Sequence, residues 1–339
     1  MKKVAILALE QSLPMGITAV SDIFKMAGVG WDERSELTME KLFRVEAFTV
    51  DGKPIRYTDI INIIPHGSIA DAHDADIIII PSSGFRGEEL ESYPEEILEW
   101  LRKQYTLGVD IAACCTGVFV LAESGLLNGK LATTHWDYTD RFRNRYPEVK
   151  LKPEEIITED RSLFCSGGGS ACFDLCTYMI ERSYGTEVAN RCSKILLFER
   201  GRNFQTPFKI FHFQKNHQDS EILRAQQWIE ESFRRDIIID DVATFVGLGI
   251  RNFKRRFKKA TGETPIVYIQ KIRIEAAKKI LEYKDTRIEE ISGFVGYEDP
   301  GFFRKLFLRY VGMNPTDYRR KFRGCKISRS RGVKKVIPL

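Results

Sequence analysis

A cysteine between an expected strand and an expected helix is the most reactive candidate in the chain. The run Val109–Ala112 is apolar, and Cys115 follows it in a turn of small residues before a helix begins near Val118. This is the arrangement of a nucleophile elbow, which presents a side chain at the carboxyl edge of a sheet. Backbone N–H groups at the start of the helix would lower the pKa of the Cys115 thiol. The alternative is a small buried thiol, which is the interpretation we favour for Cys114.

Four cations on one face of an expected helix form the second candidate site. Within residues 250–261, Phe253 and Phe257 are about one helical turn apart and would face inward. The opposite face carries Arg251, Lys254, Arg255 and Lys258. Such a face can enter the major groove of DNA, where Arg and Lys reach guanine edges or phosphates. The alternative is a basic face that is merely solvated.

The region that carries these cations is an internal repeat. Phe245-Val246-Gly247 recurs as Phe294-Val295-Gly296 at a spacing of 49. After one more residue in the turn, the matches follow at a spacing of 50: Phe253 with Phe303, Phe257 with Phe307, Gly262 with Gly312, Pro265 with Pro315 and Tyr268 with Tyr318. Each copy has a short apolar helix, a glycine suited to a left-handed turn, and a second helix. This pattern predicts two helix-turn-helix units.

The helices that would position the two units follow from apolar periodicity and capping residues. We expect them near residues 220–234, 239–246, 250–261, 264–283, 287–295, 300–311 and 315–323. The helix at 264–283 would be about 30 Å long, close to the roughly 34 Å helical repeat of DNA. A strut of that length would let both second helices dock on one side of the duplex.

This region resembles the DNA-binding domain of AraC-type regulators. The resemblance covers about 105 residues and rests on the segments 248–257, 261–268, 291–299, 302–307 and 312–319. It implies that Arg251, Lys254 and Arg255 face bases in the first unit. The corresponding positions of the second unit hold Pro300, Gly301, Arg304 and Lys305. Because Pro300 and Gly301 offer no side-chain donor, the second unit is expected to contact the DNA backbone more than the bases.

The first 200 residues alternate strand and helix patterns. We expect strands at 4–8, 43–50, 77–81 and 109–112, and helices at 17–28, 88–105, 118–124 and 188–198. The run Ile77–Ile80 is β-branched and continuous, as in a strand that is covered on both faces. The predicted fold class is therefore α/β, with a doubly wound, mostly parallel sheet, followed by an all-α domain with two helix-turn-helix units.

The first part of the chain is similar to the class I glutamine amidotransferase-like superfamily. More narrowly, it is similar to the intracellular-protease-like sensor domain that precedes an AraC-type module in some regulators. The resemblance rests on Pro81–Gly84, Cys115–Gly117 and Ala122–Trp136. Hydrolytic members have a histidine directly after the cysteine, where this chain has Thr116. Many relatives have an acidic residue where this chain has Gly16.

These departures leave Cys115 and His135 as vestigial catalytic candidates, with His135 as the one plausible base. We therefore expect no efficient acyl transfer, and we interpret the pocket as a binding site for a small polar or anionic ligand. Its expected residues are Ser83, Gly84, Cys115, Thr116 and His135. No cofactor and no metal are expected. Two alternatives stay open: a cysteine hydrolase with residual activity at Cys115, and a redox sensor in which Cys115 is oxidised.

The charge distribution and the cysteine content indicate what kind of partner the protein binds and in which cellular compartment it acts. The chain of 339 residues has a formal net charge of +5, but residues 219–339 hold 27 lysines and arginines against 16 aspartates and glutamates, so the remainder is acidic. A basic C-terminal region favours a polyanionic partner. The seven cysteines are odd in number and lack zinc spacing, which favours reduced thiols in the cytoplasm. No apolar stretch is long enough for a membrane helix.

Together these observations predict a sequence-specific DNA-binding transcriptional regulator. We expect a sensor domain at 1–200, a linker at 201–218, a DNA-binding domain at 219–324 and a basic tail at 325–339. Its partners would be promoter or operator DNA, a small-molecule effector, a second copy of the chain in a homodimer and RNA polymerase, with no membrane. A non-specific architectural DNA binder is a further alternative, and it would show no sequence preference at physiological salt.

Overall fold

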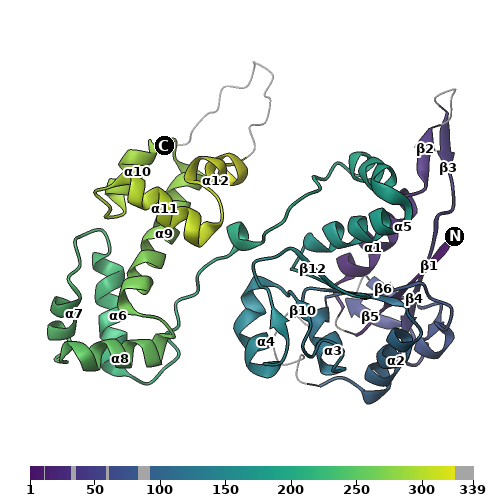
Figure 1. Ribbon diagram of the computed structural model, residues 1–339, viewed down its shortest axis with the longest axis horizontal. Coiled ribbons are helices and arrows are strands. Elements are labelled where there is room, and N and C mark those ends of the chain that lie inside the picture. The colour runs from purple at the N-terminus through teal and green to yellow at the C-terminus, as the bar shows by residue number, and fades with distance from the viewer. Residues whose placement is uncertain (11, 32–35, 59–60, 83–91, 325–339) are drawn as a thin grey trace. The chain divides into compact units, whose positions relative to one another are not determined.

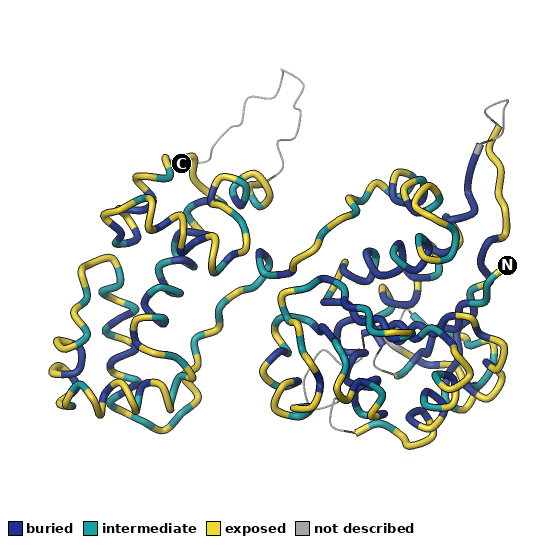
Figure 2. The backbone as a smooth tube through the Cα atoms, viewed as in Figure 1, coloured by how far each residue is buried: buried dark blue, intermediate teal, exposed yellow. Residues whose placement is uncertain are grey.

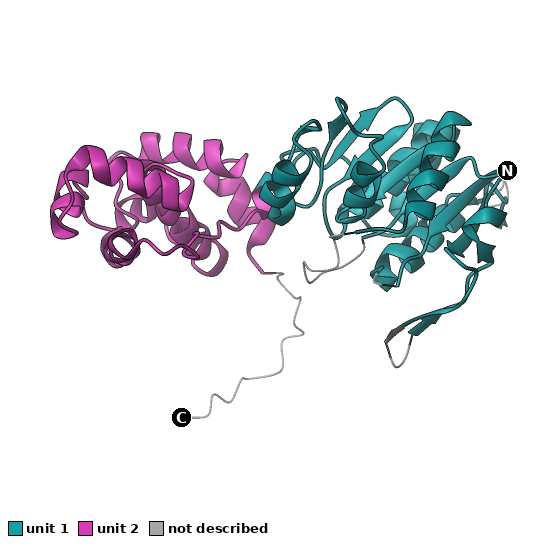
Figure 3. Ribbon diagram, turned by 90° about the horizontal axis from the view of Figure 1, so that it is seen from below, with its two compact units in different colours: residues 1–206 teal, residues 207–339 magenta. Residues whose placement is uncertain are grey.

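The computed structural model describes the chain except for residues 11, 32–35, 59–60, 83–91 and 325–339. The chain divides into two compact units, residues 1–206 and residues 207–339 (Figure 3). The boundary lies within the segment 201–218. Residues 202–205 pack on unit 1, where Gln205 is buried, whereas Phe211 and Phe213 pack on aromatic side chains of unit 2. The basic tail from residue 325 lies outside the described residues.

Unit 1 is built on a seven-stranded sheet in the order β12-β13-β9-β8-β1-β4-β7, of which β12, β1 and β4 are labelled in Figure 1. All neighbouring pairs are parallel except β12 and β13, which are antiparallel. The predicted α/β class with a mostly parallel sheet is therefore confirmed. The strands are β1 (Lys2–Leu7), β4 (Phe43–Thr49), β7 (Gly67–Ser68), β8 (Ile77–Ile80), β9 (Asp110–Cys114), β12 (Ile157–Asp160) and β13 (Leu163–Ser166).

Helices cover both faces of this sheet. Ile77 and Ile79 of β8 belong to a core with α1 (Pro14–Met26) and α5 (Ala171–Ile195). Ile78 and Ile80 belong to the opposite core with α2 (Glu95–Thr106) and α3 (Gly117–Glu123). Successive side chains of a strand point to opposite faces, so this run of four isoleucines fills both cores. The central strands are accordingly dark blue in Figure 2, and helix α4 (Thr139–Arg145) completes the unit.

Several small elements of unit 1 were not predicted. Three two-stranded sheets lie beside the main one: β2 (Val29–Trp31) with β3 (Leu37–Met39), β5 (Ile55–Thr58) with β6 (Ile61–Ile63), and β10 (Leu131–Ala132) with β11 (Lys150–Leu151). The expected helix at 88–105 begins at Glu95, and residues 88–91 lie outside the described residues. The expected helix at 188–198 is the last part of α5, which has a break at Gly185, where φ is 85°.

Unit 2 consists of helices, and their bounds lie within two residues of the predicted ones. They are α6 (Ser220–Ser232), α7 (Ile239–Phe245), α8 (Ile250–Thr261), α9 (Pro265–Tyr283), α10 (Ile288–Phe294), α11 (Pro300–Val311) and α12 (Pro315–Phe322). Helix α9 contributes Tyr268 and Ile272 to one buried cluster and Ile274 and Leu281 to another. The unit therefore has two small cores joined by one continuous helix, as the repeat requires.

The turns of the two repeats have the same backbone conformation. Gly247 follows α7 with φ of 73°, and Gly296 follows α10 with φ of 92°. Both values lie in the left-handed region that favours glycine, so each turn can redirect the chain sharply into the second helix. Within the described ranges, no helix combines the length and the apolar character that a membrane span requires.

Candidate functional site

Helix α8 presents the four cations that the sequence singled out on its exposed side. Phe253 and Phe257 are fully buried, whereas Arg251, Lys254, Arg255 and Lys258 are exposed. At about 100° per residue, these four cations share one arc of the helix opposite the two phenylalanines. Among the residues that the structure describes, Arg251, Lys254 and Lys258 have no hydrogen-bond or ion-pair partner, so their charges are available to an external polyanion.

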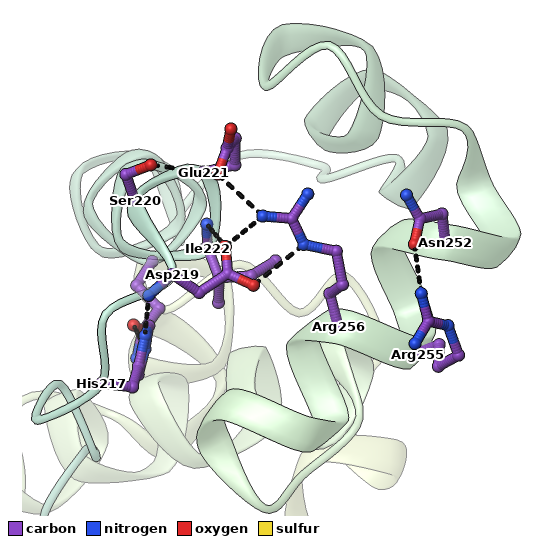
Figure 4. Close-up of polar contacts among 9 residues, drawn as sticks. His217, Asp219, Ser220, Glu221, Ile222, Asn252, Arg255 and Arg256 are labelled. Atoms are coloured by element: carbon purple, nitrogen blue, oxygen red, sulfur yellow. Dashed lines mark hydrogen bonds and ion pairs between the residues drawn. The ribbon is translucent and has the colours of Figure 1, made fainter.

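Arg255 differs from these three because its guanidinium is held by a neighbour. Its Nη2 donates to Oδ1 of Asn252, three residues earlier, over 2.8 Å (Figure 4). Both side chains are exposed. The contact restricts the guanidinium without neutralising it, because the amide oxygen carries no net charge. Arg255 therefore keeps a full positive charge in a restricted orientation.

The second unit presents a weaker cationic face. In α11, Arg304 and Lys305 are exposed, but Arg304 forms an ion pair with Glu289 of α10. The position that matches Lys258 holds Leu308, which is 52% exposed. Pro300 begins the helix, and Gly301 donates its N–H to the N-cap Asp299 over 2.7 Å. Only Lys305 on this face is therefore a cation without a partner among the described residues.

Cys115 lies at the strand–helix junction in a strained backbone conformation. Its φ is 56°, in the left-handed region that is unusual for a residue other than glycine. Its N–H donates to Ser166 O over 3.0 Å, and its carbonyl accepts from Thr134 Oγ1 over 2.7 Å. These two bonds hold the turn between β9 and α3. The predicted elbow geometry is thus present in the backbone.

The predicted lowering of the Cys115 pKa is wrong. Burial raises the pKa of this thiol, although hydrogen bonds from the Ser82 side chain and from the amides of Thr116 and Gly169 oppose the effect. Cys115 is only 3% exposed, so loss of hydration outweighs the amides at the start of α3. Thr116, which stands where hydrolases have a histidine, is itself buried and bonds through Oγ1 to Ser82 Oγ over 2.8 Å.

His135 is poorly suited to act as the base of a Cys–His pair. Burial lowers its pKa, although the Asp137 carboxylate opposes this, so the ring is a weaker base than a solvated imidazole. Its Nδ1 accepts a hydrogen bond from Asp137 N over 3.1 Å, which occupies the ring's lone pair and assigns the proton to Nε2. Among the described contacts, none joins His135 to Cys115.

Two glycines lie where the space around the elbow is restricted. A Cβ on Gly16 would lie 2.9 Å from Pro81 Cβ, so the position that is acidic in relatives has no room for a side chain here. A Cβ on Gly168 would lie 1.6 Å from His135 Cδ2, which means that the ring rests directly on this glycine. The predicted ligand residues Ser83 and Gly84 lie outside the described residues.

A pocket of about 570 Å³ lies at the carboxyl ends of β1 and β4, and Cys115 is not among the described residues that line it. It is lined by both polar and apolar side chains: Leu9, Glu10, Thr49, Val50, Asp51, Lys53, Tyr93 and Ile97 among them. Sequence reasoning missed it by following the cysteine. The rule that ligands bind outside the carboxyl ends of strands, where the strand order reverses around β1, could have indicated it. Within the described ranges, no group of three or more His, Cys, Asp or Glu side chains is placed to hold a metal.

Comparison with known proteins identifies a matching family for each part of the chain. The DJ-1/PfpI family matches residues 2–182, and the family described as a helix-turn-helix domain matches residues 242–321. The HTH-type transcriptional regulator GbdR of Pseudomonas aeruginosa is 27% identical over 289 residues, which cover 84% of this chain and 77% of that protein. The predicted resemblance to AraC-type regulators with an intracellular-protease-like domain is thereby confirmed.

Two further relatives bear on the first unit. One is a transcriptional regulator protein from Vibrio parahaemolyticus, whose crystal structure matches with a TM-score of 0.50 at 24% identity. The match covers 57% of this chain and 98% of that protein's chain, and it concerns the fold alone. The isonitrile hydratase of Pseudomonas putida is 29% identical over 137 residues, which cover 40% of this chain and 58% of the enzyme. The first unit is thus similar both to regulators and to an enzyme.

Proposed function

The chain belongs to the DJ-1/PfpI family and joins that domain to an AraC-type helix-turn-helix domain, and we propose that unit 1 senses a small molecule and controls how unit 2 reads promoter DNA. The observation that supports DNA reading is the face of α8, where Arg251, Lys254 and Lys258 are exposed without partners among the described residues. Arg and Lys in this arrangement recognise guanine edges and phosphates of the major groove.

The two units would contribute unequally to recognition. The first would read bases through Arg251, Lys254 and Arg255, with Lys258 on flanking phosphates. The second would contact the backbone through Lys305 and, once its ion pair opens, Arg304. Helix α9, which is about 28 Å long, would place both helix-turn-helix units on one face of the duplex. We expect an operator with a strongly specified half and a weakly specified half.

Equilibrium binding of the full chain tests this assignment. Fluorescence anisotropy would compare the duplex most enriched in a selection from random DNA with a shuffled duplex of equal composition at 0.15 M salt. We expect at least roughly a thousandfold preference, the low end of the range typical of specific DNA-binding proteins. Lys254→Ala should reduce the preference, whereas Lys279→Ala, which removes an exposed lysine of α9, should leave it unchanged. Equal affinity for both duplexes would favour a non-specific architectural binder.

The sensing site would be either the elbow around Cys115, Thr116 and His135 or the pocket at the ends of β1 and β4. A screen of small metabolites by thermal shift would reveal ligands, and two variants would assign them. Val50→Trp fills the pocket, whereas Cys115→Phe fills the elbow. A ligand whose stabilisation is lost in only one variant identifies its site. A ligand that stabilises the chain without changing its DNA affinity would contradict its role as an effector.

We also propose that the chain is not an enzyme, that it acts in the cytoplasm as a homodimer, and that it contacts RNA polymerase when bound to DNA. The buried thiol of Cys115 and the occupied lone pair of His135 argue against a cysteine hydrolase. The similarity to isonitrile hydratase keeps an enzyme as the second candidate. Turnover of an isonitrile by the full chain, lost in Cys115→Ser, would establish that candidate. Loss of DNA affinity after peroxide treatment, absent in Cys115→Ser, would instead indicate a redox sensor.

A further inference from the structure

Arg256 lies on the same helix as the DNA-facing cations but points away from them, toward the start of α6 (Figure 4). Its Nε donates to Asp219 Oδ2 over 2.9 Å, and its Nη2 donates to Asp219 Oδ1 over 2.6 Å. The same Nη2 also contacts Glu221 Oε2 over 2.8 Å. The guanidinium therefore forms a two-pronged contact with one carboxylate and a further contact with a second. Such paired contacts fix orientation as well as distance.

The carboxylate that Arg256 binds is itself fixed by the backbone. Asp219 is the N-cap of α6, and its Oδ1 accepts from Ile222 N over 3.2 Å. Its own N–H donates to His217 Nδ1 over 3.3 Å. The side chains of Arg256 and Asp219 are 26% and 22% exposed, so water screens the pair only partly. Arg256 thus joins α8 to a rigid point on another helix, not to a mobile surface group.

The position of Arg256 in α8 can be compared with the matching position of α11 in the second repeat. The residue that matches Arg256 at the spacing of 50 is Leu306, which is 5% exposed and packs in the second core. The same position therefore secures α11 by apolar packing and α8 by an ion pair. An apolar contact tolerates small rotations of a helix, whereas a two-pronged ion pair does so less readily.

We propose that Arg256 is a positioning residue that sets the sequence preference of the first helix-turn-helix unit without contacting DNA. This inference rests on the proposed DNA-reading function. Arg251 and Lys254 can discriminate between bases only if the rotation of α8 about its axis is fixed, because hydrogen bonds to base edges weaken steeply with misalignment. The contact with Asp219 supplies that constraint from the side of the helix that faces away from DNA.

The test uses the full chain and an operator selected from random DNA. Affinities are measured for the operator and for versions with one base changed in either half, at several salt concentrations. For Arg256→Ala we expect the discrimination at the first half to fall roughly fivefold, the low end of what one mismatched base is worth. Discrimination at the second half and the slope of log affinity against log salt should not change. Arg256→Lys keeps the charge without the planar fork, so it should retain the salt slope but only part of the discrimination.

Two matched variants keep the test decisive. Asp219→Asn preserves an N-cap side chain but removes the charge, so it should reproduce the loss of discrimination even if Arg256→Ala unfolds. Lys259→Ala removes an exposed cation of the same helix and should have no effect on discrimination. A shallower salt slope in Arg256→Ala with intact discrimination would show a phosphate contact and overturn the proposal. The proposal would also be overturned if the wild-type chain discriminates between bases and both Arg256→Ala and Asp219→Asn retain that discrimination. A wild-type chain with no sequence preference at all would instead contradict the proposed function as well.

Discussion

Replacing Glu289 with glutamine should strengthen DNA binding by releasing Arg304. The two side chains are 47% and 57% exposed, and water screens an ion pair of this kind so strongly that it contributes little to folding. The variant should therefore melt close to the wild type. On DNA, however, the Glu289 carboxylate competes with phosphate for the guanidinium. One additional phosphate contact steepens the plot of log affinity against log salt by about 0.9, which amounts to about eightfold in affinity for each tenfold drop in salt.

The assay is fluorescence anisotropy with one operator duplex between about 0.05 and 0.3 M salt, a range over which counterion release dominates. Glu289→Gln should show the steeper slope, and Arg304→Ala should remove the gain when it is added to the same chain. Asp240→Asn is the matched control, because Asp240 holds the equivalent position of the first repeat and has no ion pair with Lys254 among the described residues. The reasoning fails if Glu289→Gln leaves the slope unchanged, or if the slope rises equally when Arg304 is absent.

Three further predictions concern unit 1. Arg202→Ala should lower the free energy of unfolding in urea by about 2 kcal/mol, because it leaves Asp174, whose side chain is 5% exposed, without its ion-pair partner. Adding Asp174→Asn should recover part of the loss, and a full loss in the double variant would contradict this cause. Because burial raises the pKa of Cys115, iodoacetamide should modify it slowly at pH 7 and faster as pH rises above 9; rapid modification near pH 6 would instead indicate an activated nucleophile. Gly168→Ala should displace the His135 ring and cost about 1–3 kcal/mol in thermal or urea unfolding, and an unchanged stability would show that the ring moves freely.

The helices of unit 2 could be predicted because their ends are marked by residues with strong local preferences. Pro265 and Pro315 begin helices α9 and α12, where a missing N–H costs nothing. Gly262 and Gly312 end the preceding helices with φ of 78° and 76°. These preferences act over a few residues, so the sequence carries them directly. The repeat supported each boundary a second time.

Unit 1 was less predictable because the features that were predicted wrongly or missed there depend on contacts between residues distant in sequence. The rule that a helix start lowers a thiol pKa is local, but the burial of Cys115 arises from packing of the whole sheet. The antiparallel pairing of β12 with β13 follows a two-residue turn at Arg161 with φ of 59°, which nothing in that residue's type indicates. In unit 2, the ion pair between Arg256 and Asp219 likewise spans 37 residues, so local sequence preferences do not indicate it.

The measurement that tests the central claim most directly is a selection of bound sequences from random DNA with the full chain, repeated with Arg251→Ala and Lys254→Ala. The account predicts an enriched motif with two elements about one helical turn apart, of which the more strongly specified element degrades in both variants. A wild-type chain that enriches no motif, or one whose motif is indifferent to both substitutions, would contradict the claim that α8 reads DNA.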